Sequence, residues 1–402
     1  MCCEKFQYVI VGAGLAGVSA AKAIRGLDSK GSILLVGREF RLPYHRPPLS
    51  KDLWFGDNQV EETLIESLSF YKDNHIQMRL GTSIDRIDPD RKTVTDRELR
   101  VVGFEKLLLA TGGTPRRLAI PGGDGPGVCY YRDLDDYVRM SRSITPNTRA
   151  LVIGGGFIGS EMAAAISSKA KQVSILFPEP YLGAAVFPLS LATAIGRQYQ
   201  ARGIALLSGD RPASIEDRGN VFTTVTEHGN HLHAEVVLAG IGIRPEVEVA
   251  QKAGLEIDGG IVVNERLETS HPDIYAAGDN VQFFYPTLGQ RRRVAHWACA
   301  LGQGTQAGRN MAGSAEPYTS LPYFFSDLFD FGYEAVGDTD PNLDIRMVWE
   351  TPNEKGIIYY LRDQRVRGVM MCNVWNRVDE ARALIESGRQ MRPDDLEKAI
   401  RW

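Results

Sequence analysis

The sequence has few cysteines and no cysteine pair. Its 402 residues include five cysteines, an odd number, and none of them forms a Cys-x-x-Cys motif. They are Cys2, Cys3, Cys129, Cys299 and Cys372. This usage argues against a disulfide framework and favours reduced thiols in a reducing compartment. We therefore expect a cytoplasmic protein, and we predict no metal site.

Long apolar runs and concentrated positive charge are also missing. The chain has no stretch of about 18 apolar residues, so no membrane insertion is expected. Its N-terminus lacks the basic, apolar and cleavage regions of a secretory signal, although Cys2-Cys3 leaves lipidation open. The 46 basic residues are spread along the chain, the net charge is -4, and the one basic cluster is Arg291–Arg293. Since nucleic-acid binding needs a basic face, no nucleic-acid partner is expected.

Glycine is abundant, and its placement predicts a duplicated unit. The chain contains 41 glycines and is long enough for two or three domains. The order strand, glycine turn, helix, strand occurs twice, which predicts two nucleotide-binding units about 140 residues apart. The expected elements are Phe6–Val11, Val18–Ile24 and Ser32–Val36 in the first copy, and Leu151–Ile153, a helix to about Ser168 and Val173–Phe177 in the second.

The first turn reads Gly12-x-Gly14-x-x-Gly17. In such a motif the first glycine permits the tight turn, the second admits a pyrophosphate and the third lets helix and strand pack closely. The helix N-terminus then offers free N–H groups to the phosphates. An acid about 20 residues later binds the adenosine ribose. Glu39 is the candidate, with a register that is open by one residue and a surface glutamate as the alternative.

The second turn reads Gly154-x-Gly156-x-x-Gly159. Glu179 lies just beyond the following strand, where a carboxylate accepts hydrogen bonds from a free 2′-hydroxyl and repels a 2′-phosphate. We therefore predict a preference for NADH over NADPH, with a solvated turn residue as the alternative. Two nucleotide folds in one chain suggest two nucleotides, and FAD with NADH is the natural pair, because a flavin accepts a hydride and can release single electrons.

Further elements follow from apolar runs and turn residues. Pro121–Gly127 is rich in proline and glycine and predicts a crossing between domains. The remaining expected elements are the strands Leu107–Ala110, Val236–Ile241, Ile274–Ala277, Gly356–Leu361 and Arg367–Met371, the last two antiparallel, and the helix Asp379–Ser387.

Several longer segments resemble apoptosis-inducing factor and the bacterial ferredoxin reductases of the putidaredoxin and rubredoxin type, a family of FAD-dependent pyridine nucleotide oxidoreductases. The resemblance covers nearly the whole chain. The segments near the C-terminus look particularly like apoptosis-inducing factor. The segments are Leu42–Lys51, Ala110–Arg116, Gly154–Glu161, Ile274–Asp279, Phe325–Asp327, Gly332–Ala335 and Tyr360–Asp363.

The resemblance implies an α/β fold of the glutathione-reductase type, with two tandem Rossmann-like domains. A discontinuous FAD-binding domain would comprise residues 1–118 and 250–317. An NAD-binding domain would comprise residues 119–249, and an α+β C-terminal domain residues 318–402.

The resemblance also implies site residues. Lys51 would lie near flavin N5 and pair with Glu161, while His296 and Trp297 would lie at the flavin edge, and these four form the expected catalytic set. The FAD-binding residues would be Gly12, Gly14, Gly17, Glu39, Arg46 at the phosphate or ribose, Lys51, Thr111, Gly112, Arg116 and, at the ribityl chain, Asp279. The NAD-binding residues would be Gly154, Gly156, Gly159, Glu161, Glu179 and Gly242.

Some residues depart from the family pattern. Arg38 stands where relatives commonly carry the ribose-binding acid, which puts the FAD adenosine contact in doubt. His296-Trp297 combines the histidine of apoptosis-inducing factor with the tryptophan of the ferredoxin reductases, and two aromatic core residues are the alternative. Phe325 replaces a tryptophan. No cysteine falls in Arg41–Ser50, so electrons would have no thiol stop.

The expected function is FAD-dependent oxidation of NADH, in which hydride passes to flavin N5 and electrons pass on to a small acidic carrier, a ferredoxin or rubredoxin. The cluster Arg291–Arg293 could receive that carrier or be a solvated turn. The alternatives are an NADH-responsive redox and binding protein with slow turnover, like apoptosis-inducing factor, and an NADH:quinone or diaphorase activity. The protein is expected to be a monomer or a homodimer.

Overall fold

The computed structural model describes residues 4–56 and 59–401, which form two compact units. Unit 1 holds the described residues within 1–45, 60–114 and 244–323. Unit 2 holds those within 46–59, 115–243 and 324–402. Each unit thus gathers distant parts of the chain. The three domain ranges expected from the sequence remain a prediction.

Unit 1 is built on a sheet with the strand order β3-β2-β1-β6-β5-β4, in which β18 also pairs with β6. The central strands β1, β2 and β3 are parallel, as are β1 and β18 with β6, while β4 and β5 are antiparallel additions. The strands are β1 (Glu4–Val11), β2 (Ile33–Val36), β3 (Ile76–Arg79), β4 (Ile84–Asp88), β5 (Thr93–Asp96), β6 (Val101–Leu109) and β18 (Ile274–Ala276).

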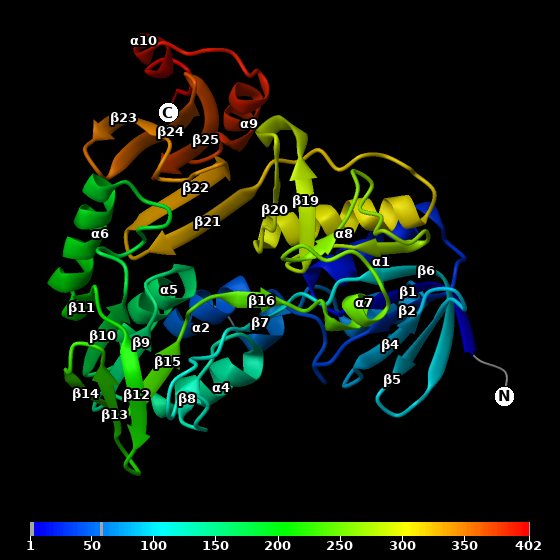
Figure 1. Ribbon diagram of the computed structural model, residues 1–402, viewed down its shortest axis with the longest axis horizontal. Coiled ribbons are helices and arrows are strands. Elements are labelled where there is room, and N and C mark those ends of the chain that lie inside the picture. Colours follow the sequence, from blue (N-terminus) through cyan, green and yellow to red (C-terminus); the bar gives the residue numbers. More distant parts are fainter. Residues whose placement is uncertain (1–3, 57–58, 402) are drawn as a thin grey trace. The chain divides into compact units, whose positions relative to one another are not determined.

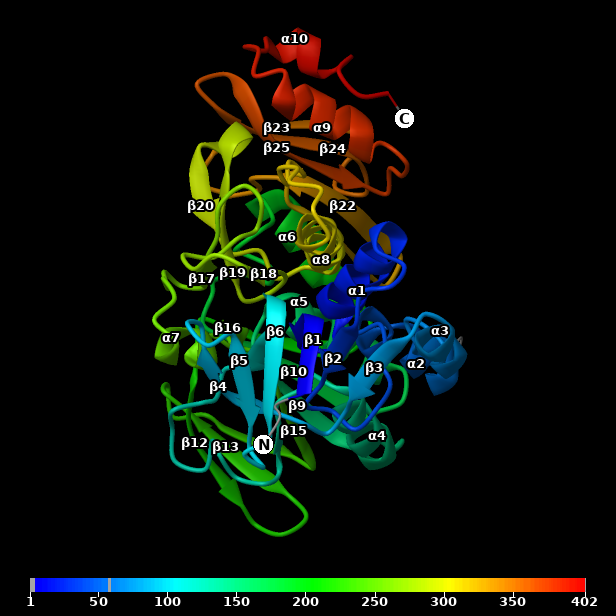
Figure 2. The ribbon, with the colours of Figure 1, turned by 90° about the vertical axis from the view of Figure 1, so that its right-hand side faces the viewer.

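Two helices from distant parts of the sequence pack together in unit 1. They are α1 (Leu15–Leu27) and α8 (Trp297–Met311), which lie side by side in Figures 1 and 2. Glycines make the approach possible: a Cβ on Gly304 would lie 2.2 Å from the backbone oxygen of Ala16, and one on Gly308 would lie 2.4 Å from that of Ala20. Any larger residue at either glycine would force the helices apart.

Shorter elements complete unit 1. The strands β17, β19 and β20 form a small sheet, in which β19 and β20 are antiparallel. The elements are η2 (Val60–Thr63), α3 (Leu68–Asp73), α7 (Glu248–Lys252), β17 (Ile261–Val262), β19 (Val281–Tyr285), η3 (Pro286–Leu288) and β20 (Gln290–Arg292).

Unit 2 contains a parallel sheet with the order β11-β10-β9-β15-β8, the arrangement expected of a second nucleotide-binding fold. A three-stranded antiparallel sheet, β12-β13-β14, accompanies it. The elements are η1 (Pro47–Ser50), α2 (Asp52–Phe55), β8 (Val128–Cys129), α4 (Leu134–Ser143), β9 (Arg149–Ile153), α5 (Phe157–Ser167), β10 (Gln172–Phe177), α6 (Leu189–Ala201), β11 (Ile204–Ser208), β12 (Pro212–Asp217), β13 (Phe222–Thr226), β14 (His231–Ala234) and β15 (Val236–Ala239).

The C-terminal part of unit 2 is a five-stranded sheet with the order β21-β22-β25-β24-β23, with α9 against β22 and β25 (Figure 1). The predicted antiparallel pairing of the strands near Gly356 and Arg367 is confirmed. The elements are β21 (Tyr323–Leu328), β22 (Phe331–Gly337), β23 (Asp344–Thr351), β24 (Lys355–Arg362), β25 (Arg365–Cys372), α9 (Val378–Glu386) and α10 (Pro393–Leu396).

The strands and helices predicted around both glycine turns are present within a few residues of their expected bounds. The expected crossing at Pro121–Gly127 lies inside unit 2, where the backbone oxygen of Pro121 accepts a hydrogen bond from the N–H of Ile215 at 2.9 Å. The chain instead leaves unit 1 beside β7 (Gly113–Pro115) and returns beside β16 (Ile243–Pro245). In the described parts of the chain, no helix has the length and apolarity needed to span a membrane.

Candidate nucleotide sites

The first glycine turn has the close packing that its motif predicts. Gly12 has a φ of +120°, and a Cβ there would lie 2.0 Å from the backbone oxygen of Ala110. A Cβ on Gly17 would lie 1.9 Å from the oxygen of Gly12. A Cβ on Gly14, at the start of α1, would meet no protein atom within 4 Å. The turn is therefore closed on its protein side and open where a pyrophosphate would lie.

A polar network lies behind this turn. Asn280 is fully buried, and its Nδ2 donates to the backbone oxygen of Leu109 at 3.0 Å and to Thr111 Oγ1 at 2.9 Å. The Thr111 hydroxyl donates to the backbone oxygen of Glu246 at 2.6 Å. Arg293 donates to the backbone oxygen of Asp279 at 3.2 Å. Among the described residues, none pairs with Asn280 Oδ1, so this buried acceptor fits a donor group of a bound nucleotide.

Sequence reasoning missed Asn280 because asparagine after Gly278-Asp279 carries no distinguishing pattern. Gly112, predicted in the same site, has a φ of +69° and continues the loop that holds Thr111. The predicted FAD residues Thr111, Gly112 and Asp279 thus lie in unit 1 with the glycine turn. Their roles at the cofactor remain a prediction.

The candidate ribose acid of the first turn is engaged by a neighbour. Glu39 Oε2 accepts a hydrogen bond from the Tyr44 hydroxyl at 2.6 Å. Arg38, at the position where the family commonly has the acid, is exposed. The tyrosine donor fixes the Glu39 carboxylate, and its role at a ribose remains a prediction.

The predicted flavin-edge residues begin α8. His296 is the N-cap residue and Trp297 the first helical residue. Trp297 Nε1 donates to His45 Nδ1 at 3.2 Å, and the two ring centroids are 5.9 Å apart. Burial lowers the pKa of His296 to about 4, and burial together with the charge of Lys22 lowers the pKa of His45. Both imidazoles are therefore neutral at pH 7.

The second glycine turn, in unit 2, repeats the geometry of the first. Gly154 has a φ of +112°, and a Cβ there would lie 2.5 Å from the backbone oxygen of Gly240. A Cβ on Gly159 would lie 1.9 Å from the oxygen of Gly154, whereas one on Gly156 would meet no protein atom within 4 Å. This turn is again open on the side where a nucleotide would lie.

A pocket of about 590 Å³, measured to its open mouth, extends from this turn. The turn and the start of α5 line one side, and the loop Gly183–Phe187 lines another. Residues of β21 and β22 complete it, namely Ser326, Leu328 and Tyr333. Glu179 is the one charged residue among the described residues that line it. A pocket with a carboxylate and without a basic side chain fits a ribose with a free 2′-hydroxyl and disfavours a 2′-phosphate.

The C-terminal sheet secures the loop over this pocket. The Tyr360 hydroxyl on β24 donates to the backbone oxygen of Val186 at 2.9 Å. The Phe187 ring packs edge-on against Tyr333, with centroids 5.2 Å apart. Nothing in the sequence indicated that Tyr360 holds the pocket loop, because a tyrosine in a predicted strand has no assigned partner.

Lys51 and Glu161 lie together, as the resemblance implies. Lys51 Nζ is 3.8 Å from Glu161 Oε1 and 3.0 Å from Asp327 Oδ2. Glu161 accepts hydrogen bonds from the hydroxyls of Ser50, at 2.6 Å, and Ser326. The cluster is formed by η1, α5 and β21 of unit 2. Sequence reasoning missed the three partners Ser50, Ser326 and Asp327.

Aromatic side chains fix the segment that carries Lys51. Trp54, which is fully buried, donates from Nε1 to the backbone oxygen of Leu49 at 2.8 Å. The Tyr131 hydroxyl donates to the same oxygen, and the Tyr137 hydroxyl donates to the backbone oxygen of Leu53 at 2.9 Å. The segment is therefore held by α4 and the residues before it.

The remaining predicted residues also lie in unit 2. Arg46 donates from Nη1 to the backbone oxygen of Arg132 at 2.7 Å. The backbone N–H of Arg116 donates to the oxygen of Gly242 at 2.9 Å, and Gly242 has a φ of +93°. Arg46, Lys51 and Arg116, which were predicted to bind FAD, thus belong to the unit of the second glycine turn rather than to that of the first, and the roles of all predicted residues at the cofactors stay predictions.

Comparison with known proteins identifies the family of the chain. Residues 6–304 match the family described as pyridine nucleotide-disulphide oxidoreductase, and the chain belongs to that family. Residues 350–387 match the family of the C-terminal part of apoptosis-inducing factor, mitochondrion-associated. The chain is accordingly an FAD-dependent NADH oxidoreductase, with the α/β fold predicted from its sequence.

The relatives include both groups named by the resemblance. The chain is 33% identical to apoptosis-inducing factor 1, mitochondrial, of Dictyostelium discoideum, over 99% of this chain and 81% of that protein. It is 34% identical to rubredoxin-NAD(+) reductase of Pseudomonas putida, over 82% of this chain and 86% of that protein. It superposes with a TM-score of 0.91 and 30% identity on the reductase in the covalent putidaredoxin reductase–putidaredoxin complex, covering 97% and 95% of the two chains.

Proposed function

We propose that this protein oxidises NADH and delivers the electrons to a small acidic iron–sulfur carrier of the ferredoxin or rubredoxin type. The observation that carries the proposal is the pair of open glycine turns, of which the second leads into a pocket with Glu179. Relatives named rubredoxin-NAD(+) reductase and ferredoxin--NAD(+) reductase support the choice of acceptor.

The residues of the chain supply binding, orientation and charge. FAD, when bound, accepts a hydride from NADH and can release the electrons singly. Gly12, Gly14 and Gly17 would cradle its pyrophosphate, and Gly154, Gly156 and Gly159 that of NADH. Lys51, by the resemblance, would stabilise negative charge on the reduced flavin.

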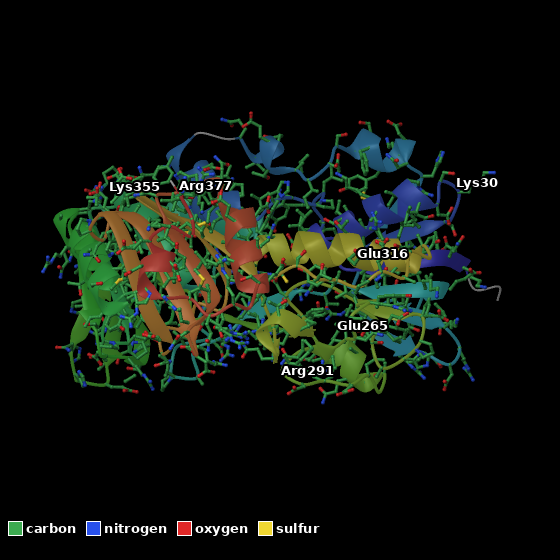
Figure 3. All side chains as sticks on the ribbon, turned by 90° about the horizontal axis from the view of Figure 1, so that it is seen from above. Lys30, Glu265, Arg291, Glu316, Lys355 and Arg377 are labelled. Carbon is green, nitrogen blue, oxygen red and sulfur yellow. The ribbon has the colours of Figure 1, made fainter. Side chains whose placement is uncertain are left out.

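An exposed basic hairpin supports an acidic carrier. Arg291, labelled in Figure 3, is exposed on β20, opposite Phe284 on β19, which is also exposed. An exposed arginine beside an exposed aromatic side chain suits an acidic partner, because charge complementarity speeds encounter and an aromatic contact adds buried area.

We also propose a cytoplasmic location. Cys129, Cys299 and Cys372 are buried and free, and burial raises the pKa of Cys129 and Cys299 to about 11. Thiols of this kind are stable in a reducing compartment.

Anaerobic titration with NADH tests the function. We expect the yellow flavin to bleach on addition of NADH and to reoxidise rapidly when a ferredoxin or rubredoxin is added, with reduction of cytochrome c as the readout. A flavin that is bleached by NADH but not reoxidised faster by any small iron–sulfur carrier would contradict the proposed acceptor. A quinone that reoxidises the flavin in place of the carriers would assign a diaphorase activity instead.

A second candidate is an NADH-responsive binding protein like apoptosis-inducing factor. The match of residues 350–387 to the C-terminal part of that family favours it. The same titration separates the candidates, because a sensor would show a stable long-wavelength charge-transfer band that decays slowly in air, whereas an electron-transfer enzyme would reoxidise quickly.

A further inference from the structure

Three consecutive residues of β21 surround the Lys51–Glu161 pair. The Phe325 ring centroid lies 4.8 Å from Lys51 Nζ, and Asp327 Oδ2 lies 3.0 Å from it. Ser326, between them, donates to Glu161. Because successive side chains of a strand point to opposite faces, Phe325 and Asp327 share the face that meets Lys51, and Ser326 takes the buried face.

The two carboxylates near Lys51 are not equivalent. The 3.0 Å distance to Asp327 is that of a charge-assisted hydrogen bond, whereas 3.8 Å to Glu161 is an ion pair without one. The Lys51 side chain is 14% exposed, so its ammonium has lost most of its water and needs a partner. Asp327 is therefore the acid that fixes the position of the Lys51 ammonium.

Glu161 is satisfied by other donors. Its side chain is 9% exposed, and each of its oxygens accepts a serine hydroxyl, from Ser50 and Ser326. A buried carboxylate held by two hydroxyls keeps its place without a direct hydrogen bond from Lys51. The pairing implied by the resemblance is therefore shared between two acids, and the closer one comes from the C-terminal sheet.

We propose that Asp327 is the positioning residue for Lys51. It holds the ammonium outward from Glu161 and offsets part of its positive charge. The inference rests on the proposed function, in which Lys51 stabilises negative charge on the reduced flavin. The C-terminal sheet would then influence how easily the flavin is reduced, through the aspartate that holds Lys51.

The test is the midpoint potential of the bound flavin, measured by spectroelectrochemical titration of the holoprotein without NADH. We expect Asp327→Asn to shift the potential in the positive direction, because Lys51, left with Glu161 as its acidic partner, stabilises the anionic reduced flavin more strongly. The shift should disappear when Lys51→Met is combined with it. Asp330→Asn is the matched control, since Asp330 lies in the adjoining turn and pairs with Arg202.

Each outcome decides the inference. Three results would overturn it. They are an equal shift from Asp327→Asn with and without Lys51, no shift from Asp327→Asn, and an unchanged potential in Lys51→Met alone. Asp327→Glu, which keeps the negative charge, should retain most of the original potential, and a shift as large as that of Asp327→Asn would also overturn the inference. The proposed function is judged separately, because the unmodified protein either is or is not bleached by NADH.

Discussion

The two glycine turns share a backbone but differ in their surroundings. At the start of the helix, Gly14 has φ and ψ of -90° and -170°, and Gly156 has -85° and -169°. The N–H of the first glycine of each turn donates a 2.8 Å hydrogen bond to a backbone oxygen of the strand after the helix, that of Val36 for Gly12 and that of Leu176 for Gly154. The motif therefore specifies a cradle, and the residues around it must decide which nucleotide stays and which exchanges.

The surroundings of the two turns differ most in the acid that follows each turn and in what covers the turn and its helix. In the first unit α1 is covered by α8, and Glu39 is bound by Tyr44. In the second unit the turn opens into a pocket in which Glu179 is exposed. A covered helix and a fixed acid suit a permanently bound cofactor, and an open pocket suits a substrate that enters and leaves.

Replacing the middle glycine of each turn by valine has the largest expected effect on nucleotide binding. We expect Gly14→Val to leave the fold intact but remove most of the flavin, because its side chain would occupy the space for the pyrophosphate. Gly156→Val should keep the flavin and raise the KM for NADH at least about tenfold, which is about 1.4 kcal/mol. Flavin absorbance after purification and NADH titration measure the two results. Loss of flavin from Gly156→Val would break the division of roles.

The pH dependence of stability between pH 4.5 and 7 should arise from His296 in unit 1. Burial lowers the pKa of His296 to about 4, from an ordinary value of 6.5. Below pH 6.5 the unfolded chain binds a proton that the folded chain refuses until about pH 4, so stability is complete above pH 6.5 and falls as the pH is lowered. The loss is at most about 3 kcal/mol. Thermal melting of the holoprotein between pH 4.5 and 7 should show this slope, and His296→Gln should flatten it. An unchanged slope would assign it to other groups.

The preference for NADH over NADPH should depend on Glu179 in unit 2. Its loss is the smallest of the three expected effects. We expect Glu179→Gln to lower the discrimination against NADPH by about tenfold, because it removes a charge that repels a 2′-phosphate. Glu39→Gln, the matched change after the first turn, should leave the preference unchanged. The ratio of kcat/KM for the two coenzymes measures both. Equal effects of the two substitutions would place the ribose contact elsewhere.

Local patterns were sufficient to predict the elements around both glycine turns. The spacing of Gly12, Gly14 and Gly17 specifies a turn between a strand and a helix, and the copy at Gly154 specifies a second. The apolar runs predicted β1, β2, β6 and β18 of the first sheet and β9, β10 and β15 of the second, but not the remaining strands of either sheet. These features depend on residues close in sequence, which is why they can be read directly.

Long-range partners could not be predicted in this way. Asp327 lies 276 positions from Lys51, and only the folding of the chain brings the two side chains together. The pairing of Lys51 with Glu161 came from resemblance, because spacing alone does not connect residues so far apart. Tyr44 lies near Glu39 in sequence, yet the hydrogen bond between them depends on how the chain turns after β2.

The close contact between α1 and α8 has a consequence for biosynthesis. Helix α8 begins about 270 residues after α1 ends, which at ribosomal elongation rates of about 5–20 residues per second is a delay of roughly 15–50 s. During that interval the small-residue face of α1, with Ala16 and Ala20, has no cover, and β18 has not yet joined its sheet. Unit 1, which contains the first strand and helix to be synthesised, is therefore completed late, after most of the chain has emerged from the ribosome.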